Sequence, residues 1–252
     1  MHDPLDLYER AVQSPAELAA FLVALHGGEP SRIREDFGGT GALSRAFVHG
    51  APGRSALVVD LDPAPLARCT GHPSLRTLVA DATELDDADP ADIIFVGNFS
   101  LGYVECRRRL VRYLEASRRR LAVGGLFACD MYGGPGAWRL GGLVRRIPMP
   151  GGSVLHYWWE HEAADPLSGM VVNAISFRVE TAGEIVEEHP RAFVYRWRLR
   201  SLPELREAML EAGFRTIEAR LDTRLDASGR PEGPAPAADL AGDWTALIVA
   251  RA

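Results

Sequence analysis

The chain has 252 residues, of which 47% are hydrophobic and 25% are charged, a composition typical of a folded globular protein rather than of a disordered, fibrous or membrane-embedded one. All 28 basic residues are arginine, which excludes any chemistry that needs a lysine, such as a Schiff base or a P-loop lysine. The net charge of −6 argues against a protein that neutralises the phosphates of a nucleic acid.

The three cysteines, Cys69, Cys106 and Cys129, lie too far apart in the sequence for a paired metal or redox motif, and they indicate no secreted disulfide framework. No stretch approaches the length of an apolar membrane-spanning helix. The first residues also lack the basic and apolar regions of a signal peptide. We therefore expect a cytoplasmic protein with no membrane partner.

Residues 1–30 space their apolar side chains at helical intervals, with a break at Ser14-Pro15, and predict two short helices. From residue 32 onward, short β-like runs alternate with helical stretches. The runs cover residues 33–37, 55–61, 77–79, 92–96 and 125–131, and the helical stretches cover 42–48, 63–69 and 106–121. This alternation predicts an α/β fold with a doubly wound, mostly parallel sheet.

The pattern changes after Tyr132. Three runs alternate in side-chain character and are separated by turn residues, which predicts an antiparallel β insertion over residues 138–200. A helix over 202–212 and strands over 214–221 and 244–250 complete the prediction of one domain spanning residues 1–252. The three runs of the insertion cover residues 153–162, 170–180 and 192–199.

Two motifs follow the first two predicted strands. Glu35-Asp36-Phe37-Gly38-Gly39-Thr40-Gly41 joins a strand to a helix, where glycines let the backbone approach a ligand and helical N–H groups are available to bind it. Glycines needed only for tight packing are the alternative. Asp60 ends the second strand 19 residues after Gly41, and a carboxylate at that place can accept both hydroxyl hydrogens of a ribose.

Further along, the third and fourth predicted strands end in Val79-Ala80-Asp81-Ala82 and Val96-Gly97-Asn98-Phe99-Ser100-Leu101. A further motif leads into the fifth predicted strand: Leu121-Ala122-Val123-Gly124-Gly125-Leu126-Phe127. With these motifs the sequence resembles the class I S-adenosylmethionine-dependent methyltransferases over nearly its whole length. The resemblance implies a Rossmann-like sheet of seven strands and S-adenosylmethionine as cofactor. It also implies direct displacement of the methyl group onto an oxygen or nitrogen of a small-molecule acceptor.

The resemblance also implies a role for each motif residue. Gly38, Gly39 and Gly41 would pack against the methionine part of the cofactor, and Asp60 would hold the ribose. Leu61 would pack on the adenine, with Asp81 and Ala82 at its edge, although Asp81 also fits a plain helix N-cap. Asn98 and Phe99 would face the space between sulfonium and acceptor, and Tyr8 is either above the cofactor or in a core.

This chain departs from the family pattern at its first motif. Phe37 stands where the family has its first glycine, so the motif acid is either Glu35 or Asp36. Arg34, Glu35 and Asp36 are also unusually polar for a central strand, and buried charges need partners. We expect Arg34 to form an ion pair or to contact the ligand directly.

Asp130, Tyr132 and His156 are the candidates on the acceptor side. An activated sulfonium makes a general base optional, but a group that titrates near neutral pH would help if the nucleophile carries a proton. In several relatives a β insertion at this point covers the active site, so residues 138–200 are expected to act as a substrate lid. We predict no metal site. A homodimer, a nicotinamide-dependent oxidoreductase and a non-catalytic S-adenosylmethionine-binding module stay open as alternatives.

Overall fold

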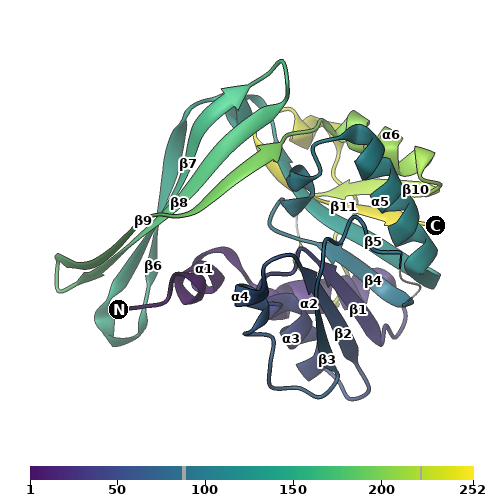
Figure 1. The fold of residues 1–252 in the computed structure, drawn as a ribbon, viewed down its shortest axis with the longest axis horizontal. Helices are drawn as coiled ribbons and strands as arrows, with labels where there is room; N and C mark the ends of the chain where they lie inside the picture. Colours follow the sequence, from purple (N-terminus) through teal and green to yellow (C-terminus); the bar gives the residue numbers. More distant parts are fainter. Residues whose placement is uncertain (87–88, 222) are drawn as a thin grey trace. The chain divides into compact units, whose positions relative to one another are not determined.

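The computed structural model describes residues 1–86, 89–221 and 223–252, and the chain divides into two compact units (Figure 1). We call Ser14–Gly134 with Arg200–Ala252 the sheet A unit, and Met1–Gln13 with Pro135–Leu199 the sheet B unit. The predicted insertion therefore falls almost wholly in the sheet B unit. The predicted domain boundaries themselves stay a prediction.

Sheet A has seven strands in the order β10-β11-β5-β4-β1-β2-β3. All neighbours among β1 to β5 pair in parallel, whereas β11 runs antiparallel to both β5 and β10. The predicted doubly wound, mostly parallel sheet is confirmed, and its strand order reverses between β1 and β4. The strands are β1 (Arg32–Asp36), β2 (Ser55–Asp60), β3 (Leu75–Val79), β4 (Ala91–Val96), β5 (Leu121–Gly133), β10 (Thr216–Arg220) and β11 (Trp244–Arg251).

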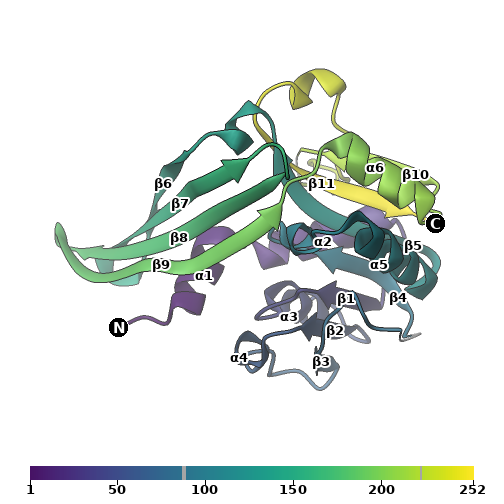
Figure 2. The ribbon, with the colours of Figure 1, turned by 45° about the horizontal axis from the view of Figure 1, so that its top comes forward.

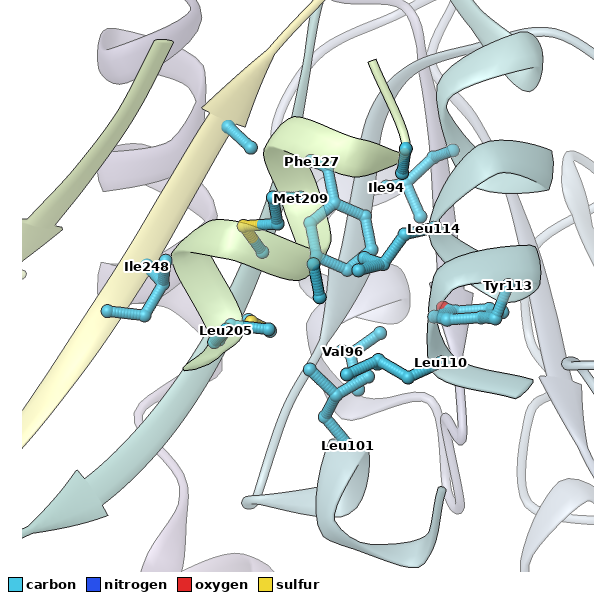
Figure 3. Packing of buried hydrophobic residues seen from close by; sticks show 14 of the residues in the cluster. Ile94, Val96, Leu101, Leu110, Tyr113, Leu114, Phe127, Leu205, Met209 and Ile248 are labelled. Carbon is cyan, nitrogen blue, oxygen red and sulfur yellow. The ribbon is translucent and has the colours of Figure 1, made fainter. Parts of the chain in front are cut away.

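Helices cover both faces of sheet A because successive strand residues point to opposite sides. On one face Ile94, Phe127 and Ile248 pack against apolar side chains of α5 and α6 (Figure 3). On the other face Ile33 and Phe95 pack against α2 and α3. Each such buried side chain contributes about 1.5–3 kcal/mol to folding. The helices are α2 (Pro15–His26), α3 (Ala42–His49), α4 (Pro63–Leu66), α5 (Arg107–Arg120) and α6 (Leu202–Glu211), with 3-10 turns at Ser100–Tyr103 and Ala237–Leu240.

Sheet B is an antiparallel meander of four long strands lying side by side (Figure 2). The three predicted strands are present, but the sequence pattern missed the first strand. Seven of that strand's eight residues are exposed, so it carries no buried alternation that a pattern can detect. The strands are β6 (Gly141–Pro148), β7 (Val154–Asp165), β8 (Met170–Thr181) and β9 (Glu184–Arg198), and the unit also holds α1 (Pro4–Val12) and 3-10 turns at Pro135–Trp138 and Pro150–Gly152.

Strand β9 begins at Glu184, eight residues before the predicted start at Ala192. The first half of the strand contains Pro190, a residue that argues against a strand in a sequence pattern. Pro190 removes a ladder hydrogen bond, which a strand tolerates best at the edge of a sheet. β9 occupies that edge position, and its register shifts nearby. Arg191 follows with a left-handed φ of 48°. A proline that argues against a central strand is therefore compatible with an edge strand.

The N-terminal segment is held on sheet B by a carboxylate with three partners. Glu187 accepts hydrogen bonds from the backbone N–H of His2 at 2.6 Å, and its carboxylate lies 2.8 Å from His2 Nδ1 and 2.7 Å from His189 Nε2. Although burial opposes the effect, these contacts lower the pKa of Glu187 to about 2. The ionised carboxylate therefore stabilises the folded unit.

We expect Glu187→Gln to lower the free energy of unfolding by about 1–2 kcal/mol at pH 7 because charge-assisted contacts are lost. A depressed carboxyl pKa stabilises the fold above the unfolded pKa and loses its effect as the pH falls. The difference in free energy of unfolding between wild type and Glu187→Gln should thus narrow below about pH 4.5. Urea unfolding at several pH values measures this difference. Glu188→Gln is the matched control, since Glu188 pairs with Arg178 while half exposed; an equal loss there would contradict the assignment.

Candidate functional site

The carboxyl ends of β1 and β4 meet where the strand order of sheet A reverses, which is where open α/β sheets bind their ligands. Three residues there adopt left-handed backbone conformations: Phe37 after β1, and Asn98 and Phe99 after β4, with φ of 56°, 54° and 59°. A non-glycine residue in this region costs about 1–2 kcal/mol. Such strain gathers at functional sites, so the switch point of this chain is its candidate site.

The glycine turn after β1 combines packing and open space. A Cβ on Gly38 would lie 2.4 Å from Val58 Cγ1, and one on Gly41 would lie 2.6 Å from Cys69 Sγ. These two glycines are therefore required by packing within the protein itself. Gly39 differs, because its φ is +53° and a Cβ there would meet no atom within 4 Å. The turn thus presents one backbone segment toward open space.

Asp60 lies at the end of β2 and holds this turn in place. Its Oδ2 accepts a hydrogen bond from the N–H of Gly39 at 2.7 Å, and its Oδ1 accepts one from the N–H of Asp62 at 2.9 Å. The carboxylate is half buried. Because each carboxylate oxygen has two lone pairs, one acceptor position per oxygen remains for two ligand hydroxyls. The structure therefore brings Asp60 and the glycine turn into direct contact.

Glu35 and Asp36 lie on opposite faces of sheet A. Glu35 Oε2 accepts hydrogen bonds from the Ser44 N–H at 3.0 Å and the Ser44 hydroxyl at 2.6 Å, at the start of the helix that follows the glycine turn. Burial raises the pKa of Glu35 to about 7, although Ser44 and Arg45 oppose the shift. Glu35 thus contacts the helix that follows the glycine turn, and its role as the motif acid stays a prediction.

Asp36 is fully buried and joined to protein groups on both oxygens. Arg34 Nε donates to Oδ1 at 2.7 Å, and the Tyr113 hydroxyl donates to Oδ2 at 2.8 Å. The predicted ion pair of Arg34 is therefore present, with both side chains at most 1% exposed. A direct contact between Asp36 and a cofactor stays a prediction that this geometry does not favour.

Asp81 follows β3 and closes its own turn. Its Oδ1 accepts from the Thr83 N–H at 3.0 Å and the Thr83 hydroxyl at 2.7 Å, and its Oδ2 pairs with Arg109. Partial burial opposes the effect, but the Thr83 and Arg109 contacts lower the pKa of Asp81. The predicted alternative of a helix N-cap is not what the structure has, because residues 82–84 form a turn, and Asp81 caps that turn. Next to it Ala82 is buried, whereas Leu61 after β2 is 69% exposed and can cover a ligand.

Asn98, Phe99, Asp130 and Tyr132 form the other side of the switch point. Asp130 Oδ2 accepts from the Asn98 N–H at 2.8 Å, and Oδ1 accepts from the Phe99 N–H at 2.6 Å. The rings of Phe99 and Tyr132 meet edge to face with centroids 4.8 Å apart. The structure thus brings together two predicted cofactor residues and two predicted acceptor-side residues.

Two predicted site residues, Tyr8 and His156, belong to the sheet B unit. Tyr8 contacts the edge of Phe193 with ring centroids 5.2 Å apart, as the core alternative for Tyr8 requires. His156 Nε2 lies 2.7 Å from Glu180 Oε2, and its ring stacks on Trp158 at 5.5 Å. The roles of both residues at a cofactor or acceptor stay predictions.

Sequence reasoning missed three partners of the site. The hydroxyl groups of Ser44 and Tyr113 donate hydrogen bonds to Glu35 and Asp36, respectively. Arg109 forms an ion pair with Asp81. Only Ser44 carried a local signal, since a serine in the first turn of a helix often binds a nearby acid or backbone group. Tyr113 and Arg109 lie on α5, far along the chain from their partners. Arg109 is the last of three consecutive arginines, a pattern that by itself is typical of a solvated helix face.

No family model matches the chain, and no curated protein matches it in sequence. Solved structures match it across nearly its full length. An S-adenosylmethionine-dependent methyltransferase from Clostridium acetobutylicum has a TM-score of 0.69 and 16% identity, and the match covers 98% of each chain. An amino pentose methyltransferase from Micromonospora echinaspora, solved with S-adenosylmethionine bound, has a TM-score of 0.68 and 17% identity and covers 100% of this chain and 98% of its own.

A sugar N-methyltransferase from a Streptoalloteichus species has a TM-score of 0.66 and 19% identity, with coverage of 100% of this chain and 93% of its own. At such identities the likeness establishes the fold. The predicted Rossmann-like sheet with an antiparallel β insertion is confirmed. Among the helices that the structure describes, none is long and apolar enough to cross a membrane. Among the described residues, no group of three or more His, Cys, Asp or Glu side chains is arranged to hold a metal ion.

Proposed function

We propose that this protein transfers a methyl group from S-adenosylmethionine to an oxygen or nitrogen of a small-molecule acceptor. The observation that carries the proposal is the arrangement of Gly39 and Asp60. A strand-end carboxylate with acceptor positions for a ribose diol lies beside a backbone segment that opens toward unfilled space. The full-length likeness to methyltransferase structures supports the same function.

The residues present fit the cofactor. Asp60 offers acceptors for the ribose hydroxyls, exposed Leu61 offers an apolar surface for adenine, and Glu35 places a carboxyl group at the helix after the glycine turn. S-adenosylmethionine, when bound, supplies an activated methyl group, so the protein needs mainly to align a nucleophile and exclude water. Phe99 and Tyr132 offer aromatic surface for that purpose, and Tyr132 and His156 are proposed on the acceptor side.

The acceptor class is inferred from chemistry and from the structural relatives. Solved structures of similar fold include methyltransferases that act on amino pentoses and other sugars. With the net charge of −6 and no lysine, a nucleic-acid substrate is disfavoured. We propose a small metabolite, with amino sugars as the first compounds to screen. A cytoplasmic location and a homodimer belong to this proposal, and the three cysteines, all described, form no disulfide.

Calorimetric titration of the whole chain tests the cofactor assignment. We expect S-adenosylmethionine and S-adenosylhomocysteine to bind with micromolar dissociation constants, and NAD to give no heat of binding under the same conditions. Methyl transfer from a labelled donor to a panel of amino sugars then separates an enzyme from a binding module. Binding of NAD in place of the two sulfur compounds would favour the oxidoreductase alternative.

The variant Gly39→Ala tests whether the glycine turn binds a ligand or is needed only for packing within the protein. The new Cβ meets no protein atom within 4 Å, so the folded chain should lose only about 1 kcal/mol for the left-handed φ. We expect the affinity for S-adenosylhomocysteine to fall at least about tenfold, a change of about 1.4 kcal/mol. The reason is that the alanine Cβ would occupy space that the ligand needs. Gly53→Ala is the matched control, with φ +79° and equally open surroundings. Equal affinities of the two variants would remove Gly39 from the site.

A further inference from the structure

The corner formed by Asn98 and Phe99 is strained, and the structure must hold it. Both residues follow β4 at the switch point, and both have left-handed φ values, 54° and 59°. Asparagine adopts this conformation at little cost, but phenylalanine does so rarely. Two consecutive residues of this kind persist only where surrounding contacts determine the backbone. The corner therefore needs a specific restraint.

The carboxylate of Asp130 provides that restraint. Each of its oxygens accepts one of two consecutive N–H groups, Asn98 at 2.8 Å and Phe99 at 2.6 Å. One planar carboxylate thus fixes two adjacent peptide groups, in the way that a bidentate acceptor fixes two donors. Leaving a buried N–H without an acceptor costs about 1–3 kcal/mol. Loss of the carboxylate would release a strained corner and two amides together.

The same geometry argues against a role for Asp130 as the base that receives a proton from the acceptor. A base must take up a proton, and a protonated carboxyl group would hold the two backbone N–H groups less strongly than the ionised one does. Burial raises the pKa of Asp130 to about 6, while the N–H groups of Phe99, Asn98 and Asp130 itself lower it. The titratable neighbour on β5 is Cys129, whose thiol pKa burial raises far above its usual value, with a contribution from the charge on Asp130.

We propose that Asp130 is a positioning residue that fixes the Asn98–Phe99 corner where cofactor and acceptor meet. Tyr132 follows Asp130 by two residues on β5, and its ring meets the edge of Phe99. Asp130 therefore determines both the backbone of Asn98 and the place of the Phe99 ring against Tyr132. This inference rests on the proposed methyl transfer for its functional meaning, whereas the clamp itself rests only on the contacts.

The chain offers a matched control at the opposite end of β4. Asp92 Oδ2 accepts two consecutive backbone N–H groups on a neighbouring segment, Ser31 at 2.8 Å and Arg32 at 2.9 Å. It thus holds two adjacent amides at the amino ends of the strands, away from the switch point, but through one oxygen. Asp130→Asn keeps one acceptor oxygen and places an NH₂ against the second amide, whereas Asp92→Asn can keep both amides on its remaining oxygen. Asp130→Asn should therefore lose more stability in urea unfolding than Asp92→Asn.

Only Asp130→Asn should change the site. We expect its affinity for S-adenosylhomocysteine, measured by calorimetry, to fall at least about tenfold, a change of about 1.4 kcal/mol. Asp92→Asn should stay within about twofold of wild type, a change inside 0.5 kcal/mol. In wild type the affinity should fall as the pH drops through about 6, where Asp130 protonates, and Asp130→Asn should lack that step. Equal affinities in both variants would show that Asp130 is only structural and would overturn the proposal.

A measurement on the unaltered chain keeps the test valid if Asp130→Asn does not fold. The amide proton resonances of Asn98 and Phe99 should both lie downfield and shift together in a pH titration with a midpoint near 6. Two amides that titrate separately, or not at all, would refute the clamp. If wild type binds no S-adenosylhomocysteine while the two amides titrate together, the proposed function fails and the clamp stands. The two failures are therefore distinguishable.

Discussion

Asp60→Ala is expected to weaken binding of S-adenosylhomocysteine by about 100-fold or more. In the proposed complex the carboxylate accepts two ribose hydroxyls, and a hydrogen bond to a charged group contributes about 1.5–3 kcal/mol. The variant also removes the acceptor that holds the Gly39 N–H at 2.7 Å. Both losses act on the same ligand surface. Calorimetric titration of the variant beside wild type measures the effect.

Two further variants separate the ligand contact from the effect on the turn. Asp62→Ala is the matched control, since Asp62 lies two residues later, is exposed and only accepts the N–H of Ala64 at 2.9 Å. It should leave the affinity within about twofold. Asp60→Asn keeps one acceptor oxygen and should fall between wild type and Asp60→Ala. Unchanged affinity in Asp60→Ala would falsify the assignment of Asp60 to the ribose.

Much of sheet A could be predicted because its signals are local. The parallel strands β1, β2 and β4 are short, largely buried runs followed by turn motifs. The spacing of Gly41 and Asp60 places these two residues at adjacent strand ends. The edge strand β6 could not be predicted in this way, since its residues are exposed and give no apolar period. Periodicity detects burial, so a strand without a buried face is invisible to it.

The candidate site was predictable only as far as motifs reach along the chain. The glycine turn and Asp60 were identified from spacing, and the structure brings them into contact. Asp130 was expected at the end of the fifth strand, but β5 runs on to Gly133. Its partners Asn98 and Phe99 follow β4 and lie more than thirty residues away along the chain. No local pattern shows that both of its oxygens hold backbone amides, so the sequence could suggest a titratable group but not these contacts.

The buried pair of Arg34 and Asp36 gives the second large expected effect, on stability. Asp36→Ala is expected to lower the free energy of unfolding by about 3–5 kcal/mol because it leaves a guanidinium buried in the sheet without its carboxylate. Arg34 and Asp36 are 1% and 0% exposed, so water cannot replace the lost partner. The Tyr113 hydroxyl would also lose its acceptor. Urea unfolding measured by circular dichroism provides the value.

Arg107→Ala is the control for loss of an arginine–carboxylate pair in general. Arg107 Nη2 lies 2.6 Å from Glu211 Oε2, but the two side chains are 55% and 51% exposed. A solvated pair of this kind contributes about 0–1 kcal/mol, so the control should stay near wild type. A loss of equal size in Asp36→Ala and Arg107→Ala would mean that burial does not decide the cost of breaking the pair.

The double variant Arg34→Met with Asp36→Leu tests whether the pair stabilises the fold at all. Burial raises the pKa of Asp36 even though Arg34 and Tyr113 oppose the shift, so burial disfavours the ionised carboxylate at a cost to stability. Replacing both charges with apolar groups removes that cost, and we expect the double variant to recover most or all of the stability lost in Asp36→Ala. Asp36 lies on the strand that ends at the glycine turn, next to Glu35. Recovered stability with weakened binding of S-adenosylhomocysteine would show that the pair shapes the site rather than stabilising the core.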